Sequence, residues 1–551
     1  MLKSKKTKLG AIILTVAMSL TMLAGCGGTS VDKAEEQIIT YNLGAEPKTL
    51  DPGTNEAVDG ATVIVNAFDG LTRLDAHDNP VPAVAKKWDV SSDGKKYTFH
   101  LKKGILWSDG KEVTAKDFEY AWKRALDPKT ASEYAYQLYY LKNGEAYNAG
   151  KVTNSNEVGV KAIDDYTLEV ELDYPTAYFL SLTAFPTYMP LRKDVVDANP
   201  DSWFRNPDTY ICNGPFKMKE WKPKDQITFV KNDKYWNAKK IKLQEIHYKM
   251  IVEETSALAA FKTGQIDFIE GPPSQEIPTL LKDGTAKIYP YLGTYFYCVN
   301  VSDKAAEVNA DVAKVLKDKR VRRALALAIN RKDIVEKITK GGQIPATSFV
   351  PPSIAENKEG KDFKDKDYYP SEGNIEEAKK LLADAGYADG KGVPTITLIY
   401  NTNQGHQNIA MAVQDMWRKN LGINVELQNQ EWKVFQVTRS NKDYEIARHG
   451  WIGDYVDPMT FLDMWTSTSG QNDAGWSNSK YDELIKKAKM ESKQAVRMKY
   501  MHEAEDILMD EMPIIPIYYY TNVVCIKDYV KNVHKSPLGM VYFDDTYIAK
   551  H

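Results

Sequence analysis

The chain has 551 residues, which is too long for one hydrophobic core and predicts three or four domain-sized units. Its composition, 43% hydrophobic and 27% charged, is typical of a folded protein. The formal net charge is −3, and residues 1–25 carry four lysines and no acidic residue, so the rest of the chain is more acidic still. Because an acidic protein binds a phosphate backbone poorly, we expect no nucleic-acid partner.

The amino terminus has the pattern of an export signal. Lysines precede an apolar run at 9–23 that is too short to span a membrane comfortably, and Leu23-Ala24-Gly25-Cys26 follows at once. This resembles a bacterial lipoprotein signal, which implies that residues 1–25 are removed and that Cys26 carries lipid. Residues 26–37 would form a flexible tether to the extracytoplasmic face of the cell membrane, as in a Gram-positive bacterium. A plain secretory signal or an anchor helix is the alternative.

Short strands and tight turns are predicted between residues 38 and 185. A strand begins at Ile38, and the segment Glu46-Pro47-Lys48 after it is extended, because proline disfavours the helical region for the residue before it. Asp93-Gly94 turns into a strand with alternating apolar residues from Tyr97 to Leu101. Thr114 to Asp117 has the pattern of a capped helix start, and a second hairpin follows Asp164-Asp165.

Motifs in this block closely resemble the signature of the extracellular solute-binding proteins of family 5, which serve peptide, nickel and related ABC importers. They are Ala85-Lys86-Lys87-Trp88, Asp93-Gly94, Tyr97-Thr98-Phe99, Trp107-Ser108-Asp109-Gly110 and Thr114-Ala115-Lys116-Asp117-Phe118. The resemblance extends along nearly all of the chain beyond the signal, and its later motifs look like those of the oligopeptide-binding members. Those motifs include Asn213-Gly214-Pro215-Phe216, Tyr235-Trp236-Asn237, Asn429-Gln430-Glu431-Trp432, Arg448-His449-Gly450-Trp451 and Asp454-Tyr455.

The resemblance implies an α/β, two-lobed periplasmic-binding-protein-like fold (class II, cluster C) with an extra inserted domain. Lobe I would gather residues 38–58, 186–290 and 522–551, domain II would be the insertion 59–185, and lobe III would be 291–521. The implied protein is a monomer that closes its lobes around an oligopeptide and passes it to the permease of an ABC importer.

From Asn374 onward, helices and strands alternate in the pattern of an α/β lobe with a parallel sheet. The predicted elements are a helix from Asn374 to Gly386, a strand at Ile396–Tyr400, a helix at Gln407–Asn420, a strand at Ile423–Leu427, a helix at Trp432–Thr438 and a strand at Ile446–Trp451. Ligands of such lobes lie at the carboxyl ends of the strands. A late apolar run, Ile514 to Val524, could return the chain to the first lobe.

Asp454 is the candidate on which the functional prediction depends. It follows the strand Ile446–Trp451 in a turn with two glycines, Gly450 and Gly453, which leave backbone polar groups open to a partner. A carboxylate beside bare strand backbone suits the ammonium end of a peptide. The alternative is a loop aspartate that caps a turn or helix.

The family resemblance supplies the other candidate residues. The backbone of Gly450, Trp451 and Ile452 would pair with the peptide, and Glu46 to Lys48 would contribute from the facing lobe. Arg448, Arg439 and His406 would meet the peptide carboxylate; the alternative for each arginine is an internal ion pair. Candidate walls of the cleft, each with a structural role as the alternative, are Trp432, Trp417, Tyr136, Tyr140, Tyr295 and Tyr297.

Motifs for catalysis, metals or phosphate are missing from the sequence. It has no Gly-x-Ser-x-Gly elbow, no His-Glu-x-x-His and no phosphate loop, so we expect neither an enzyme nor a cofactor. Cys212, Cys298 and Cys525 are too few and too widely spaced for a disulfide framework or metal site. The basic run 317–323 has the apolar spacing of an amphipathic helix, which we interpret as a solvated face rather than a nucleic-acid patch.

Two other functions remain open at this stage. One is a dipeptide, signalling-peptide or haem receptor on the same scaffold. The other is a secreted hydrolase that binds peptides in order to cut them, against which the missing nucleophile, base and metal motifs argue.

Overall fold

One large mixed sheet runs through the molecule. The computed structural model describes residues 36–357 and 359–551, and there eleven strands form the sheet in the order β15-β14-β16-β12-β17-β11-β1-β10-β9-β8, with β13 paired to β17. The central strands, β12 (Ala286–Val299) and β17 (Ile514–Ile526), are by far the longest. The others are β1 (Ile38–Asn42), β8 (Phe216–Lys222), β9 (Gln226–Lys231), β10 (Glu245–Lys249), β11 (Phe268–Glu270), β13 (Ile344–Pro345), β14 (Ile396–Asn401), β15 (Val425–Gln430) and β16 (Ile446–Ile452).

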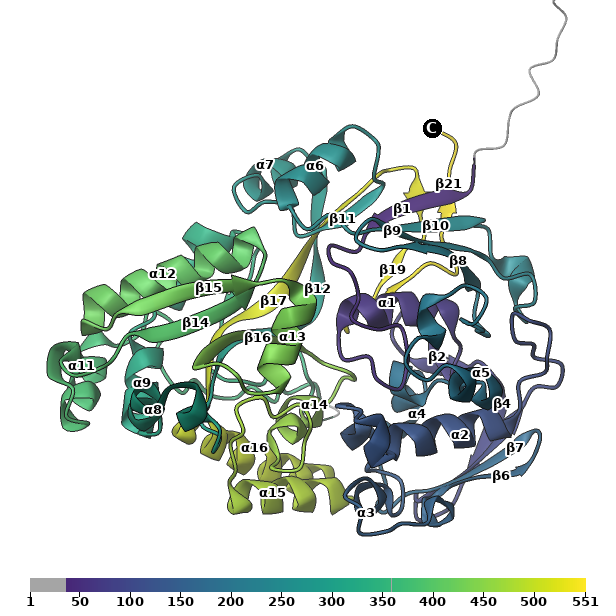
Figure 1. The fold of residues 1–551 in the computed structure, drawn as a ribbon, viewed down its shortest axis with the longest axis horizontal. Helices are drawn as coiled ribbons and strands as arrows, with labels where there is room; N and C mark the ends of the chain where they lie inside the picture. Colours follow the sequence, from purple (N-terminus) through teal and green to yellow (C-terminus); the bar gives the residue numbers. More distant parts are fainter. Residues whose placement is uncertain (1–35, 358) are drawn as a thin grey trace, which may run out of the picture.

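The two central strands join the two lobes. We call β8–β11 and β1 the β1 half of the sheet, and β14–β16 with their helices the β16 half; Figure 1 shows them on opposite sides of β12 and β17. β12 and β17 are antiparallel in two blocks, 286–290 with 521–525 and 294–298 with 514–519, and the register shifts between the blocks. Because this shift lies between the lobes, it is the natural place for a hinge.

A separate four-stranded sheet lies beside the β1 half (Figure 1). Its order is β4-β5-β7-β6, and with α2 it forms what we call the four-stranded unit. As predicted, α2 is capped at its start, where the Asp117 carboxylate accepts a hydrogen bond from the backbone N–H of Thr114 at 2.7 Å. Its elements are β4 (Ala85–Val90), β5 (Lys96–Leu101), β6 (Val160–Asp164), β7 (Thr167–Glu171) and α2 (Ala115–Leu126).

The β16 half has the predicted alternation of helix and strand. Its helices are α11 (Ile375–Asp384), α12 (Gln404–Leu421) and α13 (Trp432–Ser440). The strands β15, β14 and β16 are parallel, but β16 is antiparallel to β12, so the prediction of a parallel sheet is correct for three strands only. The helix α12 begins three residues earlier than predicted because the Asn403 side chain caps it, accepting from the His406 N–H at 3.0 Å.

The basic run 317–323 is not one solvated helix face. The chain breaks between α8 (Ala305–Leu316) and α9 (Lys319–Leu327), and the Arg322 side chain is buried. Its guanidinium donates to the carbonyls of Leu316 and Lys317, both at 2.8 Å, and to that of Met512 at 3.1 Å. Arg322 therefore satisfies helix carbonyls in the interior, a role that apolar spacing cannot reveal.

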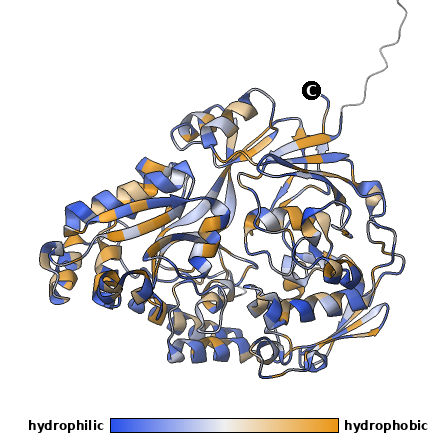
Figure 2. Cartoon of the chain, viewed as in Figure 1, coloured by the Kyte–Doolittle hydropathy of each residue, from blue (hydrophilic) through white to orange (hydrophobic). Residues whose placement is uncertain are grey.

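Further elements complete the fold. Figure 2 shows hydrophilic and hydrophobic residues alternating along the outer helices, as expected where one face packs on a core. The helices are α1 (Val58–Ala67), α3 (Gly144–Asn148), α4 (Phe179–Leu182), α5 (Lys193–Ala198), α6 (Glu254–Lys262), α7 (Ile277–Lys282), α10 (Arg331–Asp333), α14 (Met459–Leu462), α15 (Ser479–Met490) and α16 (Gln494–Glu511). The short strands are β2 (Thr72–Leu74), β3 (Pro80–Pro82), β18 (Val530–Lys531), β19 (His534–Lys535), β20 (Val541–Tyr542) and β21 (Tyr547–Ile548).

Three findings concern the sequence predictions on cysteines, metals and membranes. Cys212, Cys298 and Cys525 are free and buried. Within the described ranges no group of three or more His, Cys, Asp or Glu is arranged to hold a metal ion, and no helix has the length and apolarity to cross a membrane. The predicted signal segment 1–25 and Cys26 lie outside the described residues.

Candidate functional site

A cavity of about 730 Å³ lies between the two halves of the large sheet and the four-stranded unit. Its wall is made by the segment after β1, by the first turn of α1, by α13, by β16 and the turn after it, and by Tyr134 and Phe185. A volume of this kind is in the range of ligand-binding clefts.

One wall of the cavity is an open strand edge. β12 pairs with the whole of β16, from Gly293 opposite Ile452 to Val299 opposite Ile446, whereas β14 pairs with Ile446 and Ala447 only. The other edge of residues 448–452 therefore has no strand partner within the described part of the chain. A Cβ atom at Gly450 would lie 2.3 Å from the Tyr520 hydroxyl, so only glycine fits at this point of the edge.

The Asp454 carboxylate lies in the cavity wall, and no described residue forms an ion pair with it. It accepts hydrogen bonds from Gln137 Nε2 at 2.6 Å and from the Tyr134 hydroxyl at 3.3 Å, and its own N–H donates to Thr460 Oγ1 at 3.0 Å. Burial, together with the charge of Asp463, raises the pKa of Asp454 well above its ordinary value. Both side-chain donors belong to a distant segment of the chain, so Asp454 does not cap its own turn.

Arg448 lies on β16. Among the described residues, no carboxylate forms an ion pair with its guanidinium. It donates to the Tyr520 hydroxyl at 2.9 Å and lies 4.9 Å from the centre of the Tyr295 ring. His406 contacts the same tyrosine, with 3.4 Å between its Nδ1 and the Tyr295 hydroxyl. Burial and the nearby charge of Arg448 lower the pKa of His406 well below its ordinary value, so the imidazole is neutral.

Arg439, in contrast, is already paired. Its Nε lies 2.5 Å from Asp473 Oδ2, and His449 Nε2 lies 3.2 Å from the same oxygen. Burial and the neighbouring Arg439 lower the pKa of His449 to about 4, and Arg439 keeps the pKa of Asp473 near 2 despite its burial. Arg439 therefore forms an internal ion pair, the alternative that the sequence analysis left open for it.

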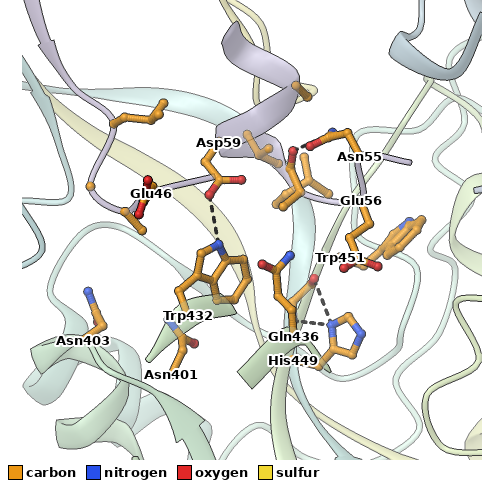
Figure 3. Close-up of a pocket in the computed structure, with 18 of the residues that line it drawn as sticks. Glu46, Asn55, Glu56, Asp59, Asn401, Asn403, Trp432, Gln436, His449 and Trp451 are labelled. Atoms are coloured by element: carbon orange, nitrogen blue, oxygen red, sulfur yellow. Dashed lines mark hydrogen bonds between the residues drawn. The ribbon is translucent and has the colours of Figure 1, made fainter. Parts of the chain in front are cut away.

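Two contacts cross the cavity from α13 to the segment that follows β1. The Trp432 indole N–H donates to Asp59 Oδ2 at 2.9 Å, as Figure 3 shows, and Lys433 Nζ lies 2.8 Å from Glu46 Oε2. Burial raises the pKa of Asp59 to about 6. Trp432 thus contacts the first turn of α1 and Lys433 the segment before it, so the cavity is closed on this side.

Nine of the predicted site residues line the cavity, and six do not. Those that line it are Glu46, His406, Trp432, Arg439, Arg448, Gly450, Trp451, Ile452 and Asp454. Tyrosines 136, 140, 295 and 297, predicted to line the cleft, are buried and do not belong to the lining of this cavity. Lys48 also lies outside it and pairs with Glu56 at 2.5 Å. Trp417 is a core residue whose indole donates to the Leu325 carbonyl.

Sequence reasoning missed several side chains at this site. Tyr134 and Gln137, which hold Asp454, come from the segment between α2 and α3, and no local pattern connects them with a turn that lies 320 and 317 residues later. Gln436 lines the cavity from α13 and could have been found, since it shares a helix face with Trp432 and Arg439 at spacings of four and three residues.

A cavity between the two halves of one sheet, with an open strand edge and an acidic and a basic side chain in its wall, is typical of a two-lobed solute-binding protein. The sequence profile of the bacterial extracellular solute-binding proteins, family 5, matches residues 79–473. The chain belongs to that family, which places it outside the cytoplasm and confirms the predicted family and fold class.

Relatives match along almost the whole chain. The oligopeptide-binding protein OppA of Bacillus subtilis is 41% identical over 97% of this chain and 98% of its own length. The dipeptide-binding protein DppE of the same organism is 36% identical over 97% and 98%. These relatives are binding proteins, which confirms the prediction that the chain is not an enzyme.

The solved structures also bear on the arrangement of the lobes. The Escherichia coli murein tripeptide binding protein MppA is 36% identical and superimposes with a TM-score of 0.86 over 94% of this chain and 99% of its own. A structure of MppA described as an unliganded open form gives a TM-score of only 0.62 over 94% and 98%. The lobes of this protein are therefore not arranged as in that open form, in agreement with the bridges across the cavity.

Proposed function

We propose that this protein is the peptide-capturing component of an ABC importer, which encloses an extended oligopeptide between its lobes and delivers it to a membrane permease. The observation that carries the proposal is the pair of ionisable groups without an ion-pair partner, among the described residues, at the two ends of the open edge of β16, Asp454 at one end and Arg448 at the other. A peptide with free termini supplies an ammonium for the first and a carboxylate for the second.

The backbone of β16 would supply affinity that does not depend on peptide sequence. Residues 448–452 can add the peptide as a further strand, through N–H and C=O groups that are not paired with β14. The Gly450 N–H donates to Nδ1 of the adjacent His449 at 2.8 Å, a bond that a peptide carbonyl would replace. Four residue steps along a strand cover roughly 13 Å, which suits peptides of about three to five residues.

The relatives support a peptide ligand. OppA and DppE of B. subtilis are named for binding oligopeptides and dipeptides, and a Haemophilus influenzae OppA structure is a complex with the peptide RPPGFSPFR. Within the chain we assign residues 38–58, 186–290 and 522–551 to lobe I, 59–185 to domain II and 291–521 to lobe III, because β12 and β17 cross between the halves of the sheet near residues 290 and 521.

The experiment that tests the function is calorimetry with tetrapeptides that have free or blocked ends, combined with mass spectrometry of whatever co-purifies with the protein. We expect unblocked peptides to bind and to be recovered intact, and an N-acetylated peptide to bind far more weakly, because its blocked end cannot pair with Asp454. Equal binding of the blocked peptide would refute the proposed orientation.

We further propose that Cys26 anchors the protein through lipid and that residues 26–37 tether it to the membrane. The support is the basic and apolar pattern ahead of Leu23-Ala24-Gly25-Cys26. Replacing Cys26 by Ser should move the protein from the membrane fraction to the soluble fraction. Retention of the Cys26→Ser variant in membranes would contradict the anchor.

A further inference from the structure

Two buried glutamines in the cavity wall have amide atoms without a partner. Gln436 on α13 and Gln471 in the loop before α15 are 1% and 2% exposed, and both line the cavity. In the described part of the chain, Gln436 Oε1, Gln471 Nε2 and the indole N–H of Trp451 have no hydrogen-bond partner. Buried polar groups are nearly always hydrogen-bonded, so these atoms point to a ligand that completes their bonds.

These three side chains gather at the end of the cavity where Asp454 lies. The Trp451 ring stacks on Tyr134, with 6.1 Å between ring centres, and Tyr134 donates to Asp454. Gly470, next to Gln471, packs so closely on the Glu133 carbonyl that a Cβ atom there would lie 2.6 Å from its oxygen. Ser440, one turn after Gln436, donates to Glu133 Oε2 at 3.0 Å. The segments that carry all three side chains therefore lie next to residues 133–134.

The charges in this part of the wall are already matched. Arg439 pairs with Asp473, and Lys48 pairs with Glu56. Burial and a hydrogen bond with Glu56 raise the pKa of Glu133 to about 9, so Glu133 is neutral at pH 7. Apart from Asp454, whose partner would be the peptide ammonium, this wall offers hydrogen bonds without a free charge.

We propose that this end of the cleft is a side-chain subsite for a carboxamide, an asparagine or glutamine at the first or second position of the peptide. A carboxamide carries one acceptor and two donors, so its oxygen can accept from Gln471 Nε2 or the Trp451 indole while its N–H donates to Gln436 Oε1. An aliphatic side chain would leave all three atoms buried without a partner, which is costly. The inference rests on the proposed function and adds a preference to it.

The test compares tetrapeptides with free ends that carry glutamine or methionine at one position and alanine elsewhere. Glutamine and methionine have similar length, so the pair isolates hydrogen bonding from size. We expect glutamine to bind about tenfold more tightly than methionine at position one or two, the effect of one well-satisfied buried hydrogen bond. At positions three and four the two peptides should bind equally.

Three variants complete the test. Gln436→Met and Gln471→Met should each reduce the preference for glutamine to less than about threefold. Gln428→Met, on the exposed face of β15, should keep the full preference. Equal affinity of the glutamine and methionine peptides in the natural protein, at every position, would overturn the subsite while leaving the proposed function intact. Failure of tetra-alanine itself to bind would overturn both.

Discussion

The two ends of the cavity differ in how they are assembled. At one end the Asp454 carboxylate, from the β16 half, is held by Tyr134 and Gln137, which come from the segment next to the four-stranded unit. At the other end Arg448 rests on Tyr295 and Tyr520, which lie on β12 and β17, so its neighbours are strands of the same sheet. The acidic end, at Asp454, thus combines residues from two parts of the molecule, whereas the basic end, at Arg448, is formed by strands of the large sheet alone.

This difference assigns separate tasks to the two ends. The donors to Asp454 come from a segment far from it in the sequence, so we propose that they reach it on closure and that capture of the ammonium is coupled to closure. Tyr295, under the Arg448 guanidinium, pairs directly with β16 on the same side of the register shift, so we propose that this part of the site is preformed in the open protein. We propose that the peptide carboxylate docks first on Arg448 and that the ammonium is enclosed afterwards.

The largest effect should come from Asp454→Ala. The peptide ammonium would be buried without its partner, and we expect binding to weaken by about 2–5 kcal/mol, measured by calorimetry with an unblocked tetrapeptide. Asp528→Ala, a change of the same kind at an exposed position outside the cavity, is the control. Acetylated peptides should bind the Ala variant and the natural protein nearly equally. If the unblocked peptide binds the Ala variant with unchanged affinity, Asp454 does not bind the peptide ammonium.

Arg448→Gln tests the basic end. Loss of charge-assisted hydrogen bonds to the carboxylate should weaken binding by about 1.5–3 kcal/mol. Arg448→Lys keeps the positive charge but lacks the planar guanidinium group. Its affinity for the peptide should lie between that of Arg448→Gln and that of the natural protein. A peptide with an amidated carboxyl terminus should lose little from either change. If amidated and free peptides lose affinity equally, Arg448 acts through the packing of its tyrosines rather than on the carboxylate.

The pH dependence of binding should come from the acidic end. Protonated Asp454 cannot pair with an ammonium, so affinity should fall as pH decreases through the raised pKa of this carboxyl, by up to about 1.4 kcal/mol per pH unit. His406 stays neutral over this range, because its pKa is lowered, and should contribute nothing. The measurement is calorimetry between pH 8 and pH 5.

Two variants decide whether Asp454 is the titrating group. Asp454→Asn should bind the peptide weakly, and its affinity should not change with pH. Burial raises the pKa of Asp59 to about 6, so Asp59 titrates in the same range, and Asp59→Asn should retain the pH dependence. If binding still depends on pH in Asp454→Asn but not in Asp59→Asn, the titrating group is Asp59, in its contact with Trp432, and not Asp454.

Local periodicity in the sequence predicted the helices and strands of this chain well. It predicted poorly which strands and side chains pair over long distances in the sequence. The alternation after Asn374 identified α11 to α13 and β14 to β16 because each element buries one face at a fixed spacing. Antiparallel pairing of β12 with β16 could not be predicted in this way, since a strand has the same pattern in either direction. The interior position of Arg322 was missed for a related reason, because its partners are carbonyls of other segments.

The same limit applied to the site. Asp454 and Arg448 were found because they flank a glycine-rich turn and match family motifs, and both line the cavity. Tyr295 and Tyr297 are buried in the structure; aromatic residues on a strand can face either a cleft or a core, and the sequence pattern does not distinguish the two. Whether Arg439 was free depended on Asp473, which lies 34 residues away and carries no motif.

The smallest effects should come from the two bridges near the middle of the cleft. Trp432→Phe removes the hydrogen bond to Asp59 and should weaken binding by about 1 kcal/mol, and Lys433→Met removes a partly exposed ion pair with Glu46 that contributes about 0–1 kcal/mol. Both bridges act on closure and touch neither peptide end, so free, acetylated and amidated peptides should lose affinity by the same factor. Calorimetry with all three peptides checks this. A loss confined to peptides with a free amino terminus would show that Trp432 serves the acidic end, and the division of the cleft into a docking end and a closing end would then be wrong.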